Sequence, residues 1–291
     1  MKSFIRKIYN SLPLVREIRG LHRQTPCLEA ISRSIQASHW QQLLNADPRL
    51  SEPKRLARFG YQVNSQNDED GIIQEIFRRI GTSNRIFVEI GIGDGLENNT
   101  AFLYTLGWKG VWIDGNGAFL ETLRSHGVPA ERLKGRQAFV NRENVASLLA
   151  ELGAPKEPDF LSLDIDQNTL HAWRGLKDYR PRVVAMEYNS VIPAEVPWEV
   201  EYHAERTWDG TQNFGASLKS FERVGREFGY SLVGCDFSGI NAFFVRDDLV
   251  GEHFAAPFTA ENHYEPPRYG LHPRMLHPRS LMHPIDLKQS P

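Results

Sequence analysis

The chain has 291 residues, of which 41% are hydrophobic and 24% charged, and its formal net charge is −2. This length suits one main domain with extensions. The near-neutral charge gives no reason to expect a nucleic-acid partner, which needs a concentrated basic surface, and no apolar run approaches the roughly 20 residues of a membrane span.

Two features of the sequence bear on the compartment. The only cysteines, Cys27 and Cys235, suit a reducing compartment better than a disulfide framework, although a single bridge stays open. The N-terminus lacks the apolar h-region and the cleavage site of a secretory signal. We therefore expect a cytoplasmic protein.

Residues 1–58 are predicted to form an N-terminal helical extension. Four prolines are expected to divide it into short helices: Pro13, Pro26, Pro48 and Pro53. The first 24 residues carry six Lys or Arg residues against one acid, with apolar residues near helical spacing. Such a segment can contact an anionic membrane surface peripherally, or a protein partner. The alternative is a helix that packs its apolar stripe on its own domain.

Residues 59–248 alternate short apolar runs with helical patterns, which predicts an α/β domain with a mostly parallel sheet and helices on both faces. The seven predicted strands lie near residues 85–90, 110–114, 136–140, 159–164, 182–188, 230–236 and 240–246, and helices near 68–80, 96–106, 116–126, 143–152 and 215–228. Only the four residues Phe-Ser-Gly-Ile (237–240) separate the last two apolar runs, residues 230–236 and 241–246. Because this is too short for a parallel crossover, the last strand is predicted to be antiparallel.

Residues 87–95 read Phe-Val-Glu-Ile-Gly-Ile-Gly-Asp-Gly, an apolar strand that runs directly into three glycines. This pattern is typical of a cofactor-binding turn. A dinucleotide-binding turn needs a third glycine three places after the second, but Leu96 stands there. Two acids accompany the turn: Glu89 precedes it, and Asp114 ends the next apolar run. An ordinary strand-to-helix bend is the alternative, since glycines also mark tight turns.

Polar side chains follow the fourth and fifth predicted strands. Asp164 and Asp166 end one apolar run, and Glu187 and Asn189 end the next. Because ligands of open α/β sheets bind outside the carboxyl ends of the strands, we expect these side chains to converge. Oxygen ligands suit Mg²⁺ or Mn²⁺, with Asp164, Glu187 and Asn189 as candidate ligands. The alternative without a metal has Asp164 capping a helix near residues 167–176 and Glu187 binding substrate.

The general base is harder to assign. His203 lies on the loop that follows the fifth strand and can titrate near neutrality, and His171, within a predicted helix, is its rival. The loop also carries aromatic residues, Trp198, Tyr202, Trp208 and Phe214, which could stack on a sugar face or form a small core of their own. Residues 249–291 form a Pro- and His-rich C-terminal tail, which we expect to wrap around the domain.

Several motifs together resemble the FkbM-type class I S-adenosylmethionine (SAM)-dependent methyltransferases, over about residues 60–248. These motifs are Ser65–Ile73 (SQNDEDGII), Glu89–Thr100 (EIGIGDGLENNT), Gly107–Gly110 (GWKG), Leu161–Asp166 (LSLDID), Met186–Asn189 (MEYN) and Phe214–Leu218 (FGASL). One departure is the continuation of Asp-Ile-Asp, which is often Gly-Asn-Asp in relatives and is Gln167-Asn168-Thr169 here. This departure puts any role of a third acid in doubt.

The resemblance implies a Rossmann-like fold and methylation of hydroxyls on sugars of polyketides, glycolipids or surface polysaccharides. It implies cofactor contacts from Glu89, Gly91, Gly93, Asp94, Asn99 and Asp114, and from Gln66 and Asp70 in a segment that closes over the methionine end. It places Asp164, Asp166, Glu187 and Asn189 in the active site.

The sequence therefore predicts a SAM-dependent O-methyltransferase acting on a hydroxyl of a sugar, glycan or glycolipid, with a divalent metal as an option. Two alternatives remain. One is a methyltransferase for a small non-sugar acceptor, which a closed apolar pocket would favour over an open, aromatic-lined cleft. The other is a catalytically silent domain that recruits a glycan-assembly partner.

Overall fold

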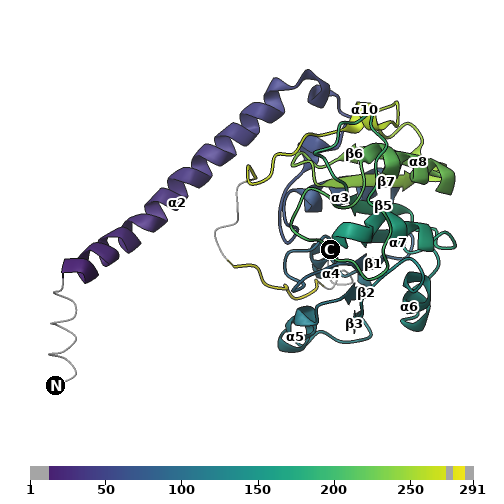
Figure 1. Cartoon of the computed structure of the whole chain (residues 1–291), viewed down its shortest axis with the longest axis horizontal. Helices are drawn as coiled ribbons and strands as arrows, with labels where there is room; N and C mark the ends of the chain where they lie inside the picture. The colour runs from purple at the N-terminus through teal and green to yellow at the C-terminus, as the bar shows by residue number, and fades with distance from the viewer. Residues whose placement is uncertain (1–12, 273–277, 286–291) are drawn as a thin grey trace.

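The computed structural model describes residues 13–272 and 278–285, with side chains from residue 27 onward. Its centre is a seven-stranded sheet in the order β3-β2-β1-β4-β5-β7-β6 (Figure 1). The strands are β1 Ile86–Ile90, β2 Lys109–Asp114, β3 Leu133–Gln137, β4 Phe160–Leu163, β5 Val183–Glu187, β6 Tyr230–Cys235 and β7 Asn241–Arg246. Strands β1 to β5 pair in parallel, whereas β7 is antiparallel to both β5 and β6. The predicted fold class is confirmed, including the antiparallel last strand.

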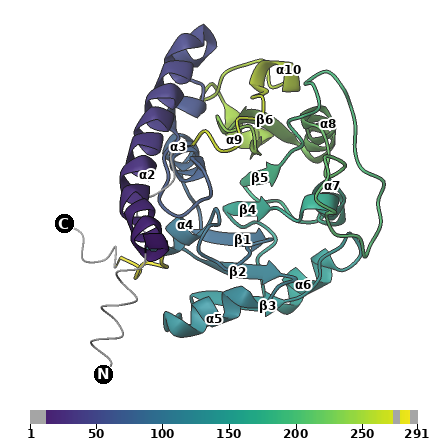
Figure 2. The ribbon, with the colours of Figure 1, turned by 60° about the vertical axis from the view of Figure 1, so that its left-hand side comes forward.

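Helices cover both faces of this sheet (Figure 2). Alternate residues of β1 divide between two cores, because successive side chains of a strand point to opposite faces. Val88 packs with the helices α6 (Val145–Glu151), α7 (Thr169–Gly175) and α8 (Leu218–Phe228). Phe87 packs with α3 (Glu69–Ile80), α4 (Ala101–Thr105) and α5 (Ala118–Ser125). The site described below lies at the edge where the parallel strands end.

Two predicted elements have different bounds in the structure. Strand β3 ends at Gln137, so the apolar residues Ala138 to Val140, predicted to lie in the strand, form a loop beyond its carboxyl end. The prediction was wrong because β3 is an edge strand with largely exposed side chains and carries little apolar signal. Helix α4 begins at Ala101 instead of near residue 96, because hydrogen bonds to Glu89 hold residues 98–100 in a turn.

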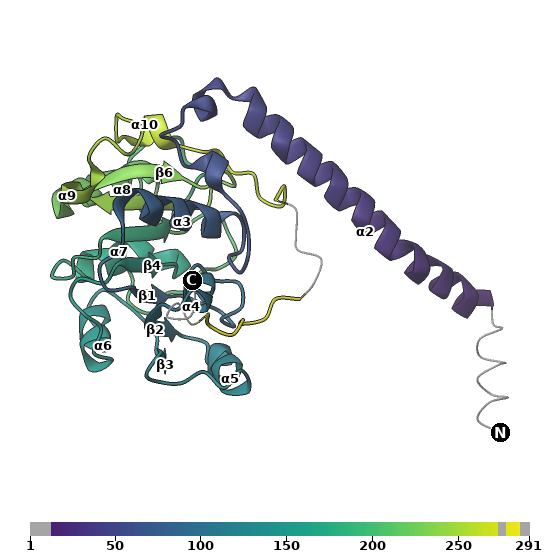
Figure 3. The same ribbon diagram turned by 180° about the vertical axis from the view of Figure 1, so that it is seen from behind.

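A single long helix, α2 (Pro13–Ala46), extends away from the sheet (Figures 1 and 3). It runs through Pro26, so the prediction that Pro26 ends a helix is wrong. Proline removes one i→i−4 hydrogen bond, and this part of the helix lies away from the domain, where no packed layer depends on its exact path. The chain then forms short 3₁₀ turns, η1 (Pro48–Ser51) and η2 (Ala57–Phe59).

Among the described side chains of α2, those that pack on the domain lie in its last turns. Trp40 and Leu44 are buried together with Leu50, Ala57 and Phe237. In contrast, three apolar side chains earlier on the helix are more than half exposed: Leu28, Ile31 and Ile35. A helix that packs its whole apolar stripe on its own domain is therefore not what the structure shows for residues 28–35. The basic segment of residues 1–12 and the side chains of residues 13–26 lie outside the described part.

The C-terminal segments pack back on the domain, as expected. After the short helices α9 (Asp247–Val250) and α10 (Ala260–His263), the Tyr188 hydroxyl donates to the Glu265 carbonyl at 2.6 Å. Residues 278–285 cross near α4, where Leu281 is buried and the Ile285 N–H donates to the Thr105 carbonyl.

Neither cysteine is in a bridge: Cys27 is exposed and Cys235 is buried, so the single disulfide that the sequence left open is not formed. Within the described residues, no helix has both the length and the apolarity needed to cross a bilayer.

Candidate functional site

The glycine turn sits at the carboxyl end of β1, beside the end of β4. Gly91, Gly93 and Gly95 all have positive φ, at 83°, 60° and 79°, a region that favours glycine. A Cβ on Gly91 would lie 1.5 Å from the Asp164 carbonyl oxygen, so only glycine allows the two strand ends to approach this closely. A Cβ on Gly93 would meet nothing within 4 Å, and Gly93 lines a large cavity. The turn thus presents bare backbone to open space.

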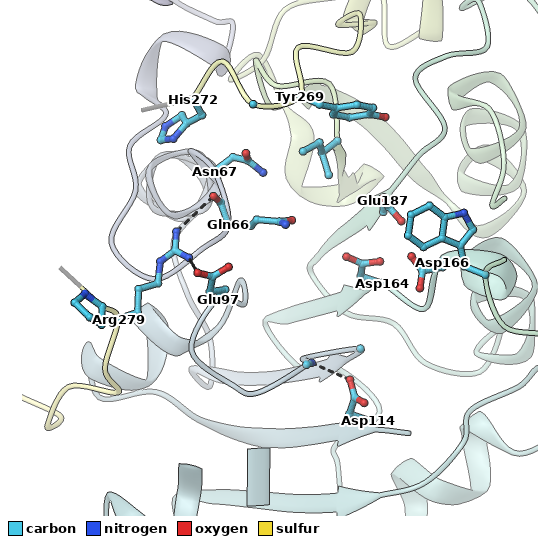
Figure 4. A pocket seen from close by; sticks show the side chains of 16 residues that line it. Gln66, Asn67, Glu97, Asp114, Asp164, Asp166, Glu187, Tyr269, His272 and Arg279 are labelled. Atoms are coloured by element: carbon cyan, nitrogen blue, oxygen red, sulfur yellow. Dashed lines mark hydrogen bonds and ion pairs between the residues drawn. The ribbon is translucent and has the colours of Figure 1, made fainter. Parts of the chain in front are cut away.

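Asp114, at the end of β2, braces this turn. Its Oδ2 accepts hydrogen bonds from the N–H groups of Ile92 at 2.7 Å and Gly93 at 2.9 Å, and its Oδ1 accepts from Asn116 N–H. The carboxylate also lines the cavity beside the turn (Figure 4). Asp114 therefore fixes the backbone and faces the place where a ligand would lie.

Glu89 and Asn99 lie behind the turn and do not line the described cavities. The buried Glu89 carboxylate accepts hydrogen bonds from the side chains of Asn98 and Thr100 and from the N–H groups of Asn99 and Thr100. Asn99 Nδ2 donates to Ser162 Oγ at 3.0 Å. Asp94 is exposed and accepts from Leu96 N–H. The structure gives these residues supporting positions, and their direct contact with a cofactor stays a prediction.

The segment before α3 reaches the cavity through Gln66 and Asn67. Asp70 does not line it. Its Oδ2 accepts hydrogen bonds from three successive N–H groups, those of residues 63, 64 and 65, at 2.7 to 2.8 Å. Burial raises the pKa of Asp70 to about 6, against the lowering effect of these hydrogen bonds. Asp70 holds the segment that carries Gln66, which is a supporting function.

Asp164, Asp166 and Glu187 form an acidic cluster at the ends of β4 and β5. These strands are neighbours in register, with Leu163 opposite Met186, so the residues that follow them meet. One carboxylate oxygen of each acid lies within 4.8 Å of the others, and all three line the large cavity (Figure 4). Asp166 has a φ of +51°, a strained conformation that is common at functional sites.

The ionisation of the cluster is strongly perturbed. Burial, followed by the nearby Asp166 charge, raises the pKa of Asp164 to about 7. Burial and the nearby Asp164 charge raise the pKa of Glu187 well above its usual value. Glu187 Oε2 is buried and has no hydrogen-bond partner. Such a cluster can hold a shared proton, or a hard divalent cation through oxygen ligands alone.

Two residues predicted for this site lie elsewhere. Asn189 Nδ2 donates to the carbonyls of Gln212 and Phe214, and its Oδ1 accepts from Val191 N–H, so Asn189 anchors a loop, and it lines none of the three cavities at the acidic cluster. His203 is exposed and lines none of the described cavities.

The rival general base, His171, and the helix-capping role considered for Asp164 do not fit the structure. His171 Nε2 is hydrogen-bonded to the Val200 carbonyl in the core, which removes it as a general base. Asp164 caps no helix, because α7 begins at Thr169 without a side-chain cap. Thr169, where relatives often have the third acid, uses its hydroxyl to accept from Ile165 N–H.

Three cavities meet at the acidic cluster. The largest, of about 970 Å³, runs along the glycine turn. A smaller one, of about 160 Å³, shares Gly91 and Asp114 with it and has Ala138, Phe139, Val140 and Ile165 among its walls. A third, of about 310 Å³, is lined by Asp166 and Glu187 and by four apolar residues, Val191, Trp208, Phe214 and Tyr269. Trp208 and Tyr269 are about half exposed, so this third cavity is open to solvent.

Sequence reasoning found only part of this lining. It singled out Trp208 and Phe214, but also Trp198 and Tyr202, which line none of these cavities. It missed Phe139, because the run around it was taken for strand interior. It missed Tyr269 and Arg279, because the tail has no periodicity that ties it to the sheet. The signal that the sequence offers for them is their residue type, an aromatic and a cationic side chain in a tail without a periodic pattern.

The sequence matches no protein-family model and no curated protein. The chain is similar in structure to an rRNA methylase from Streptococcus thermophilus, with 15% identity, coverage of 60% of this chain and 95% of that chain, and a TM-score of 0.33. The N-terminal domain of EvdMO1 with S-adenosylhomocysteine (SAH) bound is 14% identical, with coverage of 73% of this chain and 94% of that chain and a TM-score of 0.38. The glycopeptide N-methyltransferase MtfA complexed with SAM is 10% identical, with coverage of 64% of this chain and 96% of that chain and a TM-score of 0.39. Similarity this low carries no information on the acceptor of this chain.

Proposed function

We propose that the protein is a SAM-dependent O-methyltransferase that acts on a hydroxyl of a sugar, glycan or glycolipid. The observation that carries the proposal is that an acidic cluster and a bare glycine turn open into one cavity at the carboxyl ends of the parallel strands. A methyl-donor site and a group that can manage a hydroxyl proton are thereby adjacent.

The residues present fit the cofactor. The small cavity walled by Phe139 and Val140 suits a flat apolar ring such as adenine. Asp114, shared by the two cavities, lies where it can accept hydrogen bonds from ribose hydroxyls. The methionine part would then run along Gly91 and Gly93, where no Cβ obstructs it. When bound, SAM supplies a methyl group on a positively charged sulfur, and a wall of carboxylates favours that charge.

Asp164 is the residue best suited to handle the proton of the acceptor hydroxyl. Its pKa of about 7 lets it exchange a proton near neutral pH. Glu187 lies beside it, with carboxylate oxygens of the two residues within 4.8 Å of each other, and the nearby Asp164 charge favours the protonated form of Glu187. The cluster can therefore position an acceptor hydroxyl and remove its proton as the methyl group transfers.

A divalent cation, Mg²⁺ or Mn²⁺, is compatible with the same cluster. Asp164, Asp166 and Glu187 would hold it, and the unpartnered Glu187 Oε2 is a ready ligand. When bound, such an ion would lower the pKa of the acceptor hydroxyl. A cation would also relieve the repulsion that raises the pKa of Asp164 and Glu187.

The third cavity supports a sugar over a small apolar acceptor. Trp208 and Phe214 pack edge to face, with ring centroids 5.9 Å apart, and Tyr269 lines the same cavity beside Glu187. The cavity is open and aromatic-lined, whereas a small apolar molecule would favour a closed pocket. A sugar ring stacked there would present a hydroxyl to the acidic cluster.

The test is transfer of an isotopically labelled methyl group from SAM to a panel of oligosaccharide and glycolipid acceptors, followed by hydrolysis and mass spectrometry. A labelled methyl ether on a sugar supports the proposal. Label found only on nitrogen or on a small non-sugar acceptor contradicts it. Tight SAH binding without transfer to any acceptor would favour the catalytically silent alternative.

A further inference from the structure

Arg279, on the C-terminal segment, forms part of the wall of the large cavity (Figure 4). Its guanidinium donates to the carbonyls of Ser65 at 2.8 Å and Gln66 at 3.4 Å, and it forms an ion pair with Glu97. The Arg279 side chain is only 10% exposed. Its Nε is buried and has no hydrogen-bond partner.

The charge of this cavity is one-sided. Five carboxylates line it: Glu97, Asp114, Asp164, Asp166 and Glu187. Among the lining residues that the structure describes, Arg279 alone is a lysine or arginine. A ligand that carries both a positive sulfur and a negative carboxylate would thus find carboxylates for the first and, among the described lysines and arginines of this wall, Arg279 for the second.

The positions of the cavities fix which end of the cofactor meets Arg279. Asp114 lines both cavities, Phe139 lines the small one, and Gln66 and Arg279 line the large one. If adenine occupies the small cavity and ribose lies at Asp114, the methionine part extends into the large one. Its carboxylate is therefore directed toward the wall that carries Gln66 and Arg279.

We infer that Arg279 binds the carboxylate of the methionine part of the cofactor. This inference rests on the proposed function and adds a binding residue from the tail, outside the region of the glycine turn and strand ends. In the structure Glu97 forms an ion pair with the Arg279 guanidinium. The Glu97 side chain is 58% exposed and can turn into solvent. The carboxylate of the ligand then takes its place.

The test compares two nucleosides by calorimetry on the full chain. SAH carries the carboxylate, whereas 5′-methylthioadenosine has the adenine, ribose and thioether without the amino-acid part. Loss of a charge-assisted hydrogen bond costs about 1.5–3 kcal/mol, or roughly 10- to 100-fold. Arg279→Gln should weaken SAH binding by that factor and change methylthioadenosine binding less than about twofold.

Glu97→Gln is the matched control, because it breaks the same ion pair but keeps the cation. If Arg279 merely clasps the tail to the domain, Glu97→Gln will reproduce the loss, or Arg279→Gln will weaken both nucleosides equally; either result overturns the inference. Should Arg279→Gln fail to fold, the wild type decides: decarboxylated SAH must bind at least about tenfold more weakly than SAH, and equal binding overturns the inference. A wild type that binds neither nucleoside contradicts the proposed function itself.

Discussion

At the scale of single residues, Asp164 and Glu187 make a poor structural pair. Burial and the charge of Asp166 raise the pKa of Asp164, burial and the charge of Asp164 raise the pKa of Glu187, and in the described structure Glu187 Oε2 has no partner. Buried polar groups without partners cost stability. Their proximity is understandable if they serve a ligand, because perturbed carboxyls cluster at functional sites.

We therefore expect Asp164→Asn and Glu187→Gln to reduce turnover by about 100-fold or more, because each removes a group that handles the acceptor proton. Neither side chain contacts the glycine turn through a hydrogen bond, so SAH binding should change less than about threefold. Single-turnover methyl transfer and calorimetry measure the two quantities. Wild-type rates in both variants would show that the cluster is structural.

Two glycines of the turn offer a matched pair of substitutions. Gly91→Ala would place Cβ 1.5 Å from a backbone oxygen, so we expect a loss of about 3 kcal/mol or more in the free energy of unfolding. Gly93→Ala meets no atom within 4 Å, so we expect only the backbone strain of about 1–2 kcal/mol.

The methyl group added in Gly93→Ala would project into the cavity. SAH binding should therefore weaken, although the variant stays folded. Urea unfolding and calorimetry check both halves of this prediction. Unchanged SAH affinity in Gly93→Ala would mean that the ligand does not pass the turn.

At the scale of elements, the sheet was predictable because four of its parallel strands, β1, β2, β4 and β5, are short, largely buried apolar runs. The two acidic strand ends were predictable for the same reason, since an acid after such a run stands out. Strand β3 was misplaced because its edge position removes that apolar signal. The loop-anchoring position of Asn189 and the exposed position of His203 were not predictable, because sequence spacing does not tell whether a side chain faces the cavity or anchors a loop.

The turn between β6 and β7 contains another perturbed acid. Asp236 is buried, its Oδ1 accepts from the N–H groups of Ile240 and Asn241, and its Oδ2 has no partner. Burial, followed by the charge of Glu69, raises the pKa of Asp236 to about 8.

This raised pKa predicts a pH dependence of stability. The folded state holds a proton that the unfolded chain releases near pH 4, so stability falls as pH rises from about 4 to about 8. Asp236→Asn keeps the Oδ1 acceptor and removes the charge. The difference in the free energy of unfolding between Asp236→Asn and wild type should shift in favour of the variant by on the order of 2–4 kcal/mol from pH 5 to pH 8.5. Urea titration at each pH measures this difference. A constant difference across this range would contradict the assignment.

At the scale of the whole molecule, α2 stands apart from the α/β domain. The exposed residues Leu28, Ile31 and Ile35 follow one another at helical spacing, and the sequence before them is basic. This combination is typical of a helix that contacts an anionic membrane surface.

We expect the full chain to sediment with vesicles that contain anionic lipid. Reversing three charges, Arg16→Glu, Arg19→Glu and Arg23→Glu, should lower binding by at least about tenfold, since each basic residue contributes about 1 kcal/mol at such a surface. Reversal of an exposed domain residue, Arg124→Glu, serves as the control. If the wild type does not sediment with these vesicles, the prediction of a membrane-contacting helix is contradicted.

The distance in sequence between the tail and the sheet explains why sequence analysis did not place residues of the tail at the site. Its described residues contribute Tyr269 and Arg279 to the cavity walls, although they follow the last strand by more than 20 residues and carry no periodic pattern. The placement of residues 278–285 depends on the packing of Leu281 and on the hydrogen bond from Ile285 N–H to the Thr105 carbonyl in α4, which only the folded domain provides.

The most direct test of the central claim is calorimetric titration of the full wild-type chain with SAH, with Mg²⁺ present and after chelation. The account predicts one site per chain with a dissociation constant on the order of micromolar, and at least tenfold weaker binding in Asp114→Ala, which lacks both the brace of the turn and the ribose acceptor. A change in affinity with Mg²⁺ would support a cation at Asp164 and Glu187. No binding of SAH under either condition would contradict the assignment of the glycine turn as a methyl-donor site.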